Sequence, residues 1–277
     1  MFENIVGHEN QKQKLCNMIK NGTVSHAYLF CGDSGIGKST IACEFAKEIL
    51  GVENLEKSTD YVYISKKEDK KDIVIEQIRK EIIDTVYELP MSSNKKVYLI
   101  DGAEHLNMSA QNALLKTLEE PPKYIVLILI ASNRGAFLPT LLSRVNEISF
   151  SALSEEKLKS YIYDKYNIKL QDDMLRYLNG SIGKANEIIQ KGYIEKFLNI
   201  DKIYSYLIKK DLLNIYNYIS NVDFNDIYMI DYLEFKLYTN GSFNCIKFIE
   251  RAKTRLKNNG NYDIVVDSMI LKIIDCI

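Results

Sequence analysis

The chain has 277 residues, which is long for one domain, so two or three domains are expected. Its 36 basic and 37 acidic side chains give a net charge of −1, which argues against a uniformly basic, nucleic-acid-coating surface. The five cysteines form no Cys-x-x-Cys pair, so neither a zinc site nor a disulfide framework is indicated. With no signal pattern and no apolar run near the ~20 residues that cross a bilayer, we expect a soluble, cytoplasmic protein without membrane contact.

The first predicted elements are a helix and a buried strand. Apolar residues recur at helical spacing between Gln11 and Lys20. The apolar run 27–31 follows His26, which we interpret as a packing residue because no partner carboxylate is evident. Cys31 and Cys43 lie within apolar patterns, and we expect free, buried thiols there.

A complete phosphate-binding loop pattern follows the first strand. The pattern is glycine, any four residues, glycine, lysine and serine, and a helix is predicted from Ser39 to Leu50. Backbone N–H groups of such a loop point inward, and the positive helix N-terminus adds to the anion site. The nucleotide-binding candidates here are Gly32, Asp33, Ser34, Gly35, Ile36, Gly37, Lys38, Ser39 and Thr40. A glycine-rich turn without a ligand would not need the lysine and the serine.

The next part of the chain alternates helices and strands. Residues 51–60 read as a loop and residues 61–64 as a short strand. Apolar residues at positions 75, 78, 82 and 86 form one stripe, so a helix is predicted from Asp72 to Leu89, before Pro90.

Asp101 ends the second strongly predicted strand, which covers residues 97–100. Ligands of open parallel sheets lie beyond the carboxyl ends of the strands. Asp101 is therefore placed to hold Mg²⁺ together with Ser39, directly or through water. The alternative is an aspartate that only caps the next helix.

The remaining elements before residue 150 complete a parallel sheet. A helix is predicted over 108–120, and the continuous apolar run 124–131 indicates a central strand covered on both faces. Asn133 follows this strand, residues 138–144 form a short element, and 147–150 a further strand. The alternation predicts an α/β fold with a helix-covered parallel sheet.

After Ser151 the sequence predicts only helices. Helices are expected from Ser154, over Asp172–Leu178, and after a turn at 180–184. The last helix carries an apolar stripe at positions 266, 270, 273 and 277. This stripe fits a core face, although a subunit interface would show the same pattern.

Three segments carry a family resemblance. Residues 110–122 read Ala-Gln-Asn-Ala-Leu-Leu-Lys-Thr-Leu-Glu-Glu-Pro-Pro, residues 138–144 end in Ser-Arg, and residues 5–9 read Ile-Val-Gly-His-Glu. Together they resemble the AAA+ subunits of bacterial DNA polymerase III clamp loaders, most closely the delta prime subunit. Val145 replaces the cysteine of the family's Ser-Arg-Cys motif. The resemblance covers most of residues 1–190.

This resemblance implies a domain plan and a set of partners. The plan is an AAA+ P-loop domain over 1–152, a small helical lid over 153–190 and an all-α collar-type oligomerisation domain over 191–277. The implied partners are gamma/tau and delta subunits in a pentamer, the sliding clamp, and primed DNA bound through the assembly. Lys116 is one basic residue among the possible DNA contacts.

The resemblance also implies residue roles. Val6 and Gly7 would line the base pocket of an ATP site with Mg²⁺ at Ser39 and Asp101. Asn133 would be the first sensor. Arg144 would be an arginine finger acting on the ATP of a neighbouring subunit, and such a finger can raise the rate by ~10³–10⁵. The alternative for Arg144 is a surface ion pair worth ~0–1 kcal/mol.

Several departures from the active ATPases bear on function. Gly102 stands where they carry the water-polarising glutamate, although Glu104 lies close in sequence, and Lys184 stands where the second-sensor arginine is usual. The zinc-binding cysteines often present after the P-loop helix are absent. We therefore expect an ATP-binding, delta prime-like subunit with little hydrolysis of its own. The alternatives are a self-contained P-loop ATPase such as the gamma/tau motor subunit, and a non-hydrolysing interaction module.

Overall fold

The computed structural model describes residues 2, 5–67 and 70–277, and the chain packs as two compact units. One unit comprises Met1–Asn167 with Gly180–Gly183, and the other comprises Ile168–Asn179 with Lys184–Ile277. The segment predicted as a separate lid is thus shared between the two units, and the three-domain division stays a prediction. Within the described ranges, no helix is both long and apolar enough to span a membrane.

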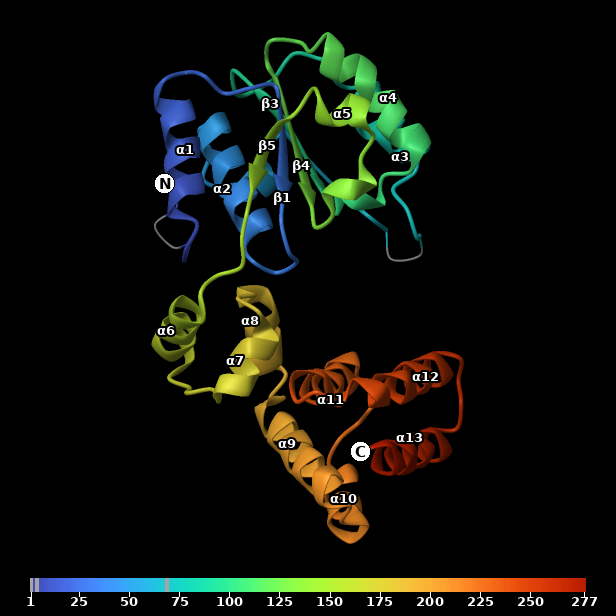
Figure 1. The fold of residues 1–277 in the computed structure, drawn as a ribbon. Helices are drawn as coiled ribbons and strands as arrows, with labels where there is room; N and C mark the ends of the chain where they lie inside the picture. The colour runs from blue at the N-terminus through green and yellow to red at the C-terminus, as the bar shows by residue number, and fades with distance from the viewer. Residues whose placement is uncertain (1, 3–4, 68–69) are drawn as a thin grey trace. The chain divides into compact units, whose positions relative to one another are not determined.

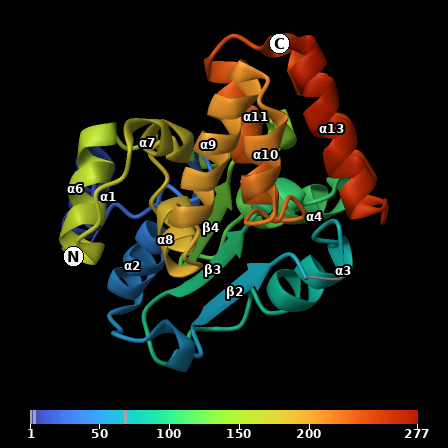
Figure 2. The same cartoon turned by 90° about the horizontal axis from the view of Figure 1, so that it is seen from below.

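A five-stranded, fully parallel sheet organises the first unit (Figure 1). Its order is β2-β3-β4-β1-β5, and Figure 2 shows β2, β3 and β4 side by side. The strands are β1 (Ala27–Cys31), β2 (Tyr61–Ser65), β3 (Lys96–Asp101), β4 (Ile125–Ala131) and β5 (Asn146–Ser149). The predicted α/β class and the central position of β4 are confirmed.

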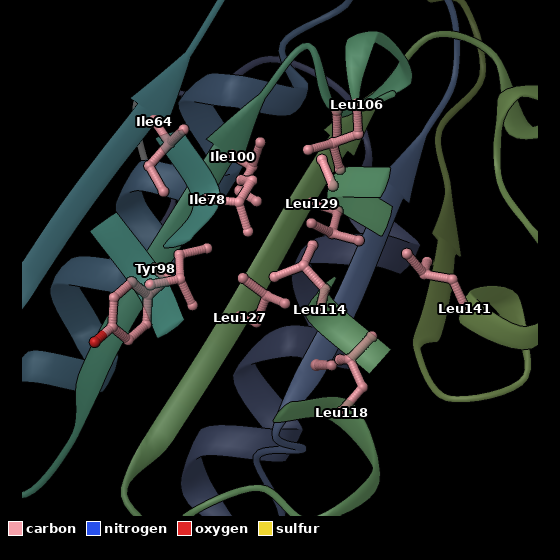
Figure 3. Packing of buried hydrophobic residues seen from close by; sticks show 14 of the residues in the cluster. Ile64, Ile78, Tyr98, Ile100, Leu106, Leu114, Leu118, Leu127, Leu129 and Leu141 are labelled. Atoms are coloured by element: carbon pink, nitrogen blue, oxygen red, sulfur yellow. The ribbon is translucent and has the colours of Figure 1, made fainter. Parts of the chain in front are cut away.

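Alternate residues of the central strands point to opposite faces, and each face has its own core. Val126 and Ile128 of β4 pack with α1 (Glu9–Lys20) and α2 (Lys38–Leu50). Leu127 and Leu129 pack on the other face, where Figure 3 shows them beside Leu114 and Ile78. Because both faces are covered, the inner strands β1, β3 and β4 are almost continuously apolar, as in other parallel sheets.

The other helices follow the predicted order. In the sheet unit they are α3 (Ile75–Ile78), α4 (Met108–Glu119), α5 (Pro139–Leu142) and α6 (Glu155–Tyr166), together with short 3-10 or π turns η1 (Leu55–Lys57), η2 (Arg79–Ile83), η3 (Ala103–His105) and η4 (Arg134–Ala136). The rest of the chain is helical, with α7 (Asp172–Leu178), α8 (Ile182–Gln190), α9 (Ile194–Lys209), α10 (Leu212–Ile219), α11 (Ile227–Thr239), η5 (Phe243–Cys245), α12 (Ile246–Lys257) and α13 (Tyr262–Cys276).

The predicted helix from Asp72 to Leu89 is wrong as a continuous element. Its start is drawn into an extended bridge, in which the Ile73 N–H donates to the carbonyl oxygen of His105 at 2.8 Å. Beyond α3 the chain widens into a π turn, and the Thr85 hydroxyl donates to the carbonyl oxygen of Glu81 at 2.9 Å. Such back-bonding competes with the helical hydrogen-bond pattern. The apolar stripe was nevertheless correct, since Ile78 and Ile82 are buried.

The helical unit has an aromatic core and a buried cation. The rings of Phe197 and Tyr232 stack with centroids 4.4 Å apart. The Lys236 ammonium of α11 forms ion pairs with Asp173 of α7 and Asp201 of α9. The stripe on α13 lies in this core, because Val266, Ile270 and Ile273 are buried.

The predicted buried cysteines need a correction. Cys31 and Cys43 carry free thiols, as expected, but both are only half-buried. Cys31 is the last residue of β1, and Cys43 lies on α2 near the Tyr61 hydroxyl, 4.0 Å from its sulfur. Cys31 lies at the carboxyl end of its strand and Cys43 lies on a helix, so neither is at the centre of the sheet.

Candidate nucleotide-binding site

The P-loop connects the end of β1 to the start of α2 (Figure 1). Gly32 has no room for a side chain, because a Cβ there would lie 2.2 Å from the carbonyl oxygen of Phe150. The backbone N–H groups of residues 33–37 donate no hydrogen bond to any other described residue. A run of free amides before a helix N-terminus is the donor set that a polyphosphate requires.

Lys38 lies over the loop rather than pointing into solvent. Its ammonium donates to the carbonyl oxygens of Gly32 and Asp33, each at 2.6 Å, and the residue is 7% exposed. Burial lowers the pKa of Lys38, and the charge of Glu104 is the largest of the opposing effects. Lys38 is therefore held among the loop oxygens, next to the acidic groups that follow β3.

Ser39 and Asp101 meet, as the predicted metal pair requires. The Ser39 hydroxyl donates to Oδ2 of Asp101 at 2.9 Å. Tyr63 of the edge strand β2, which the sequence did not single out, donates to the same oxygen at 3.1 Å. Burial and the Asp101 charge raise the pKa of Tyr63 to about 12. A hydroxyl and a carboxylate are oxygen ligands of the kind that Mg²⁺ prefers.

Glu104 lies at the same end of the sheet, on the turn η3. Its Oε1 accepts hydrogen bonds from both the backbone N–H and the hydroxyl of Ser132, which follows β4. Its Oε2 is buried and has no hydrogen-bond partner among the described residues. Burial opposes ionisation, but the bonds from Ser132 outweigh it and lower the pKa of Glu104. Glu104 is therefore an ionised carboxylate beside the P-loop lysine at neutral pH.

Asn133 follows Ser132, but its side chain forms a local hydrogen bond. Its Oδ1 accepts a hydrogen bond from the Gly135 N–H at 2.8 Å and caps η4, and the side chain is exposed. In the part of the chain that the structure describes, Asn133 makes no hydrogen bond to the P-loop. Its place beyond β4 suits a sensor, and its sensor role stays a prediction.

The N-terminal segment is tied to the P-loop by a residue that was not predicted. His8 Nε2 lies 2.7 Å from the carbonyl oxygen of Ile36, within hydrogen-bond distance, and His8 is buried. Gly7 is also buried and has a φ of 78°, and its Cβ would lie 2.1 Å from a methyl carbon of Leu153. Val6 is half-buried. A hollow of about 260 Å³ lies beside this segment, between residues 8–11 and 151–157.

Gly183 and Lys184, at the predicted position of the second sensor, make different contacts. The Gly183 N–H donates to the carbonyl oxygen of Gly35 in the P-loop at 2.7 Å, and a Cβ on Gly183 would lie 3.0 Å from the Cα of Gly35. A side chain at position 183 would therefore press against the P-loop backbone. Lys184 instead lies over the Tyr177 ring, 3.4 Å from its centroid, and burial lowers its pKa.

Arg144 is engaged within its own sheet unit. Its guanidinium forms a 2.8 Å ion pair with Glu119 of α4 and donates to the carbonyl oxygen of Thr140 at 2.7 Å. One third of the side chain is exposed. Arg144 donates no hydrogen bond to the P-loop among the described residues, and the alternative interpretation expected a surface ion pair of this kind without naming its partner.

The sheet unit matches the model of a known protein family. The model described as DNA polymerase III, delta subunit, matches residues 7–154, which is more than half of the chain. That match covers the P-loop, Asp101 and Arg144.

Curated relatives extend the likeness. The chain is 32% identical over 215 residues to DNA polymerase III subunit gamma of Buchnera aphidicola subsp. Schizaphis graminum, covering 68% of this chain and 57% of that protein. It is 31% identical over 170 residues to DNA polymerase III subunit tau of Escherichia coli K12, covering 57% of this chain and 26% of that protein. The match thus spans little more than half of one relative and about a quarter of the other.

Solved structures show the same fold. A DNA polymerase III gamma subunit-related protein of Thermotoga maritima aligns with a TM-score of 0.62 at 17% identity, over 94% of this chain and 98% of that one. A mutant of the Thermotoga maritima protein RuvB aligns with a TM-score of 0.53 at 15% identity, over 98% and 89% of the two chains. The fold is therefore of the AAA+ type, with a mostly helical C-terminal region.

Proposed function

The chain belongs to the family described as DNA polymerase III, delta subunit, and from this premise we propose that it is a clamp-loader subunit of a replicative polymerase. In this proposal it assembles with gamma/tau and delta subunits in a pentamer that loads the sliding clamp onto primed DNA. The observation that carries the proposal is the meeting of Lys38, Ser39 and Asp101 at one end of the sheet.

The proposed ligand is ATP with Mg²⁺. The free amides of residues 33–37 and the Lys38 ammonium would hold the phosphates, and Ser39 and Asp101 would hold the metal. Val6 and Gly7 would border the base, and Asn133 would sense the terminal phosphate. ATP supplies the binding energy that orders such an assembly, and this chain's residues orient it and neutralise its charge.

The surroundings of this site support a delta prime-like role. Gly102 offers no carboxylate directly after Asp101, and the Lys184 ammonium lies over the Tyr177 ring. Arg144 would then serve a neighbour's ATP as a finger in trans. Its partner Glu119 is 49% exposed, so the pair lies at the surface of the sheet unit. An exposed ion pair is worth only about 0–1 kcal/mol, so Arg144 could leave Glu119 at little cost.

The test is reconstitution of the complete loader with Arg144→Ala. We expect DNA-stimulated ATP turnover by the assembly to fall by at least about 10³-fold at the affected site. Arg134→Ala is the matched control, because Arg134 also forms one surface ion pair, with Glu147, at 2.9 Å. Unchanged turnover by the Arg144 variant, or an equal loss in the control, would remove the finger assignment.

A self-contained gamma/tau-like ATPase is the second candidate, and Glu104 favours it. This carboxylate is ionised, lies near Lys38 and is fixed by Ser132, which are properties of a water-orienting group. The named relatives are gamma and tau subunits. The isolated chain would then turn over ATP, and Glu104→Gln would stop turnover while leaving ATP binding intact. A chain that binds no nucleotide would instead be an interaction module.

A further inference from the structure

The helical unit contains a groove that the nucleotide site does not explain. It runs between α12 and α13, which lie side by side in Figure 1, and encloses about 520 Å³. Ala252, Val265 and Met269 are buried and form its apolar floor. Phe248 borders it as a half-buried ring.

Three cations line the groove without ion-pair partners. Arg251 and Arg255 lie one turn apart on α12, and Lys272 faces the same groove from α13. In the described part of the chain, none of the three forms an ion pair or a hydrogen bond through its side chain. All three are exposed. They are therefore available to an anionic ligand, and side chains four residues apart on a helix are close enough to act together.

The acidic side chain beside them does not neutralise the groove. Glu250 also lines it, but its carboxylate accepts a hydrogen bond from Lys253 at 2.9 Å. Lys253, unlike the three groove cations, is already paired, because it also forms ion pairs with Asp231 and Glu234. The positive charge of the groove is thus carried by the three unpaired cations.

The charge on α12 departs from that of the chain. Among its twelve residues, five are Lys or Arg and only Glu250 is acidic, whereas the whole chain carries a net charge of −1. Lys253 is neutralised by its carboxylate partners, but the remaining cations of α12 concentrate positive charge in a nearly neutral protein, which favours an anionic partner.

We propose that the groove between α12 and α13 binds single-stranded nucleic acid through its phosphates. Arg251, Arg255 and Lys272 would each contact a phosphate, and the hydroxyls of Thr254 and Ser268, which also line the groove, could donate to the same oxygens. The half-buried Phe248 ring would stack with a base above the floor of buried apolar side chains. Cations along a groove with an aromatic ring are the elements from which single-strand sites are built.

An acidic protein segment is the competing ligand, and two features favour nucleic acid. The cations surround an apolar floor beside an aromatic ring, which suits the flat faces of bases. The choice also rests on the proposed function, which places the chain on primed DNA. The site itself, however, is independent of the P-loop, so each can be tested without the other.

The test is fluorescence anisotropy of the full chain with a labelled 20-nucleotide oligothymidylate. Three phosphate contacts on a single strand give a slope of log K against log salt of about −2, so affinity should fall about 20-fold between 50 and 200 mM salt. Arg251→Gln alone should reduce this slope by about 0.7. The triple variant R251Q/R255Q/K272Q should lose salt-dependent binding.

A charge-matched control distinguishes binding in the groove from general electrostatic attraction to the protein. The variant K202Q/K209Q/K210Q removes three exposed cations of α9 and its C-terminal end, outside the groove. It should bind the oligonucleotide as the wild type does. An equal loss in this control would overturn the proposal, as would competition by a polyglutamate peptide that is stronger than competition by unlabelled oligonucleotide.

ATP titration of the triple variant completes the design. Wild-type nucleotide affinity shows that the P-loop is intact, and an unchanged circular-dichroism spectrum and thermal unfolding midpoint show that the separate helical unit of the variant is folded. Lost oligonucleotide binding with retained ATP binding supports the groove, whether or not the chain hydrolyses ATP. If Lys38→Ala abolishes oligonucleotide binding and the triple variant does not, the strand binds at the P-loop and the proposal fails.

Discussion

Asp101 is the residue on which the metal assignment depends, and one of its oxygens is shared. Oδ2 accepts from both the Ser39 hydroxyl and the Tyr63 hydroxyl. A Mg²⁺ ion at this oxygen would have to displace at least one of these donors. Because Ser39 would itself ligate the ion, Tyr63 is the donor that competes with it.

Replacing Tyr63 with phenylalanine should therefore strengthen metal binding. A neutral hydrogen bond contributes about 0.5–1.5 kcal/mol, so we expect the Mg²⁺ requirement for nucleotide binding to fall about 2- to 10-fold. The gain should be constant from pH 6 to 9, because the Tyr63 pKa of about 12 keeps its hydroxyl protonated there. Nucleotide affinity measured across a Mg²⁺ series checks this.

Tyr61→Phe is the control for that measurement, since the Tyr61 hydroxyl lies near the Cys43 sulfur instead of Asp101. A Tyr63 variant with weaker or unchanged Mg²⁺ dependence would show that Asp101 Oδ2 does not receive the metal.

The roles of some of these residues could be predicted from sequence patterns, and those of others could not. The P-loop and Asp101 could be predicted, because each lies directly after an apolar run and a local motif defines its chemistry. Tyr63 could not be predicted, and Glu104 could be named only for its closeness to Gly102 in sequence, because the roles of both depend on spatial neighbours. Strand pairing places Tyr63 opposite Leu99, two residues before Asp101, and this register is set by packing rather than by any nearby residue.

At the scale of elements, a buried carboxylate fixes the connection into β3. Asp60 is 1% exposed and accepts hydrogen bonds from the N–H groups of Met91, Ser92 and Ser93 at 2.7–2.8 Å. Burial alone would raise the pKa of Asp60, but these three donors lower it overall. The carboxylate therefore replaces water for three backbone groups of the loop.

Asp60→Ala should destabilise the sheet unit by about 3 kcal/mol, because it removes a charged acceptor and leaves three donors unpaired. The lowered folded-state pKa means that this stabilisation is present above the ordinary Asp pKa of 3.8 and declines as the pH falls through the folded-state value. Urea unfolding at pH 7 and pH 3 measures both. Asp84→Ala, at an exposed position, should cost under about 0.5 kcal/mol, and an equal cost would refute the role of Asp60.

The one misjudged element shows where periodicity fails. The stripe before Pro90 identified the buried positions of η2 but not its backbone, because a π turn and an α-helix bury nearly the same side chains over so short a segment. The bridge between Ile73 and Leu106 that shortens the predicted helix joins residues 33 positions apart, and no local pattern encodes it.

At the scale of the whole molecule, each of the two units contains one of the two proposed binding sites. The sheet unit contains every residue predicted to touch nucleotide, and Gly183, although distant in sequence, packs with that unit against the P-loop. The helical unit contains the groove between α12 and α13. Its fold could be predicted only as a series of helices, because its aromatic pairs and the Lys236 ion pairs join elements far apart in sequence.

Nucleotide binding by the isolated chain tests the central claim most directly. Calorimetric titration with ATP and Mg²⁺ should show one site, and Lys38→Ala should weaken it about 10- to 100-fold, as expected for losing a charge-assisted hydrogen bond. Lys47→Ala, on the same helix but paired with Glu44, should bind as the wild type does. A wild-type chain that takes up no nucleotide, or equal affinities in all three proteins, would contradict the account.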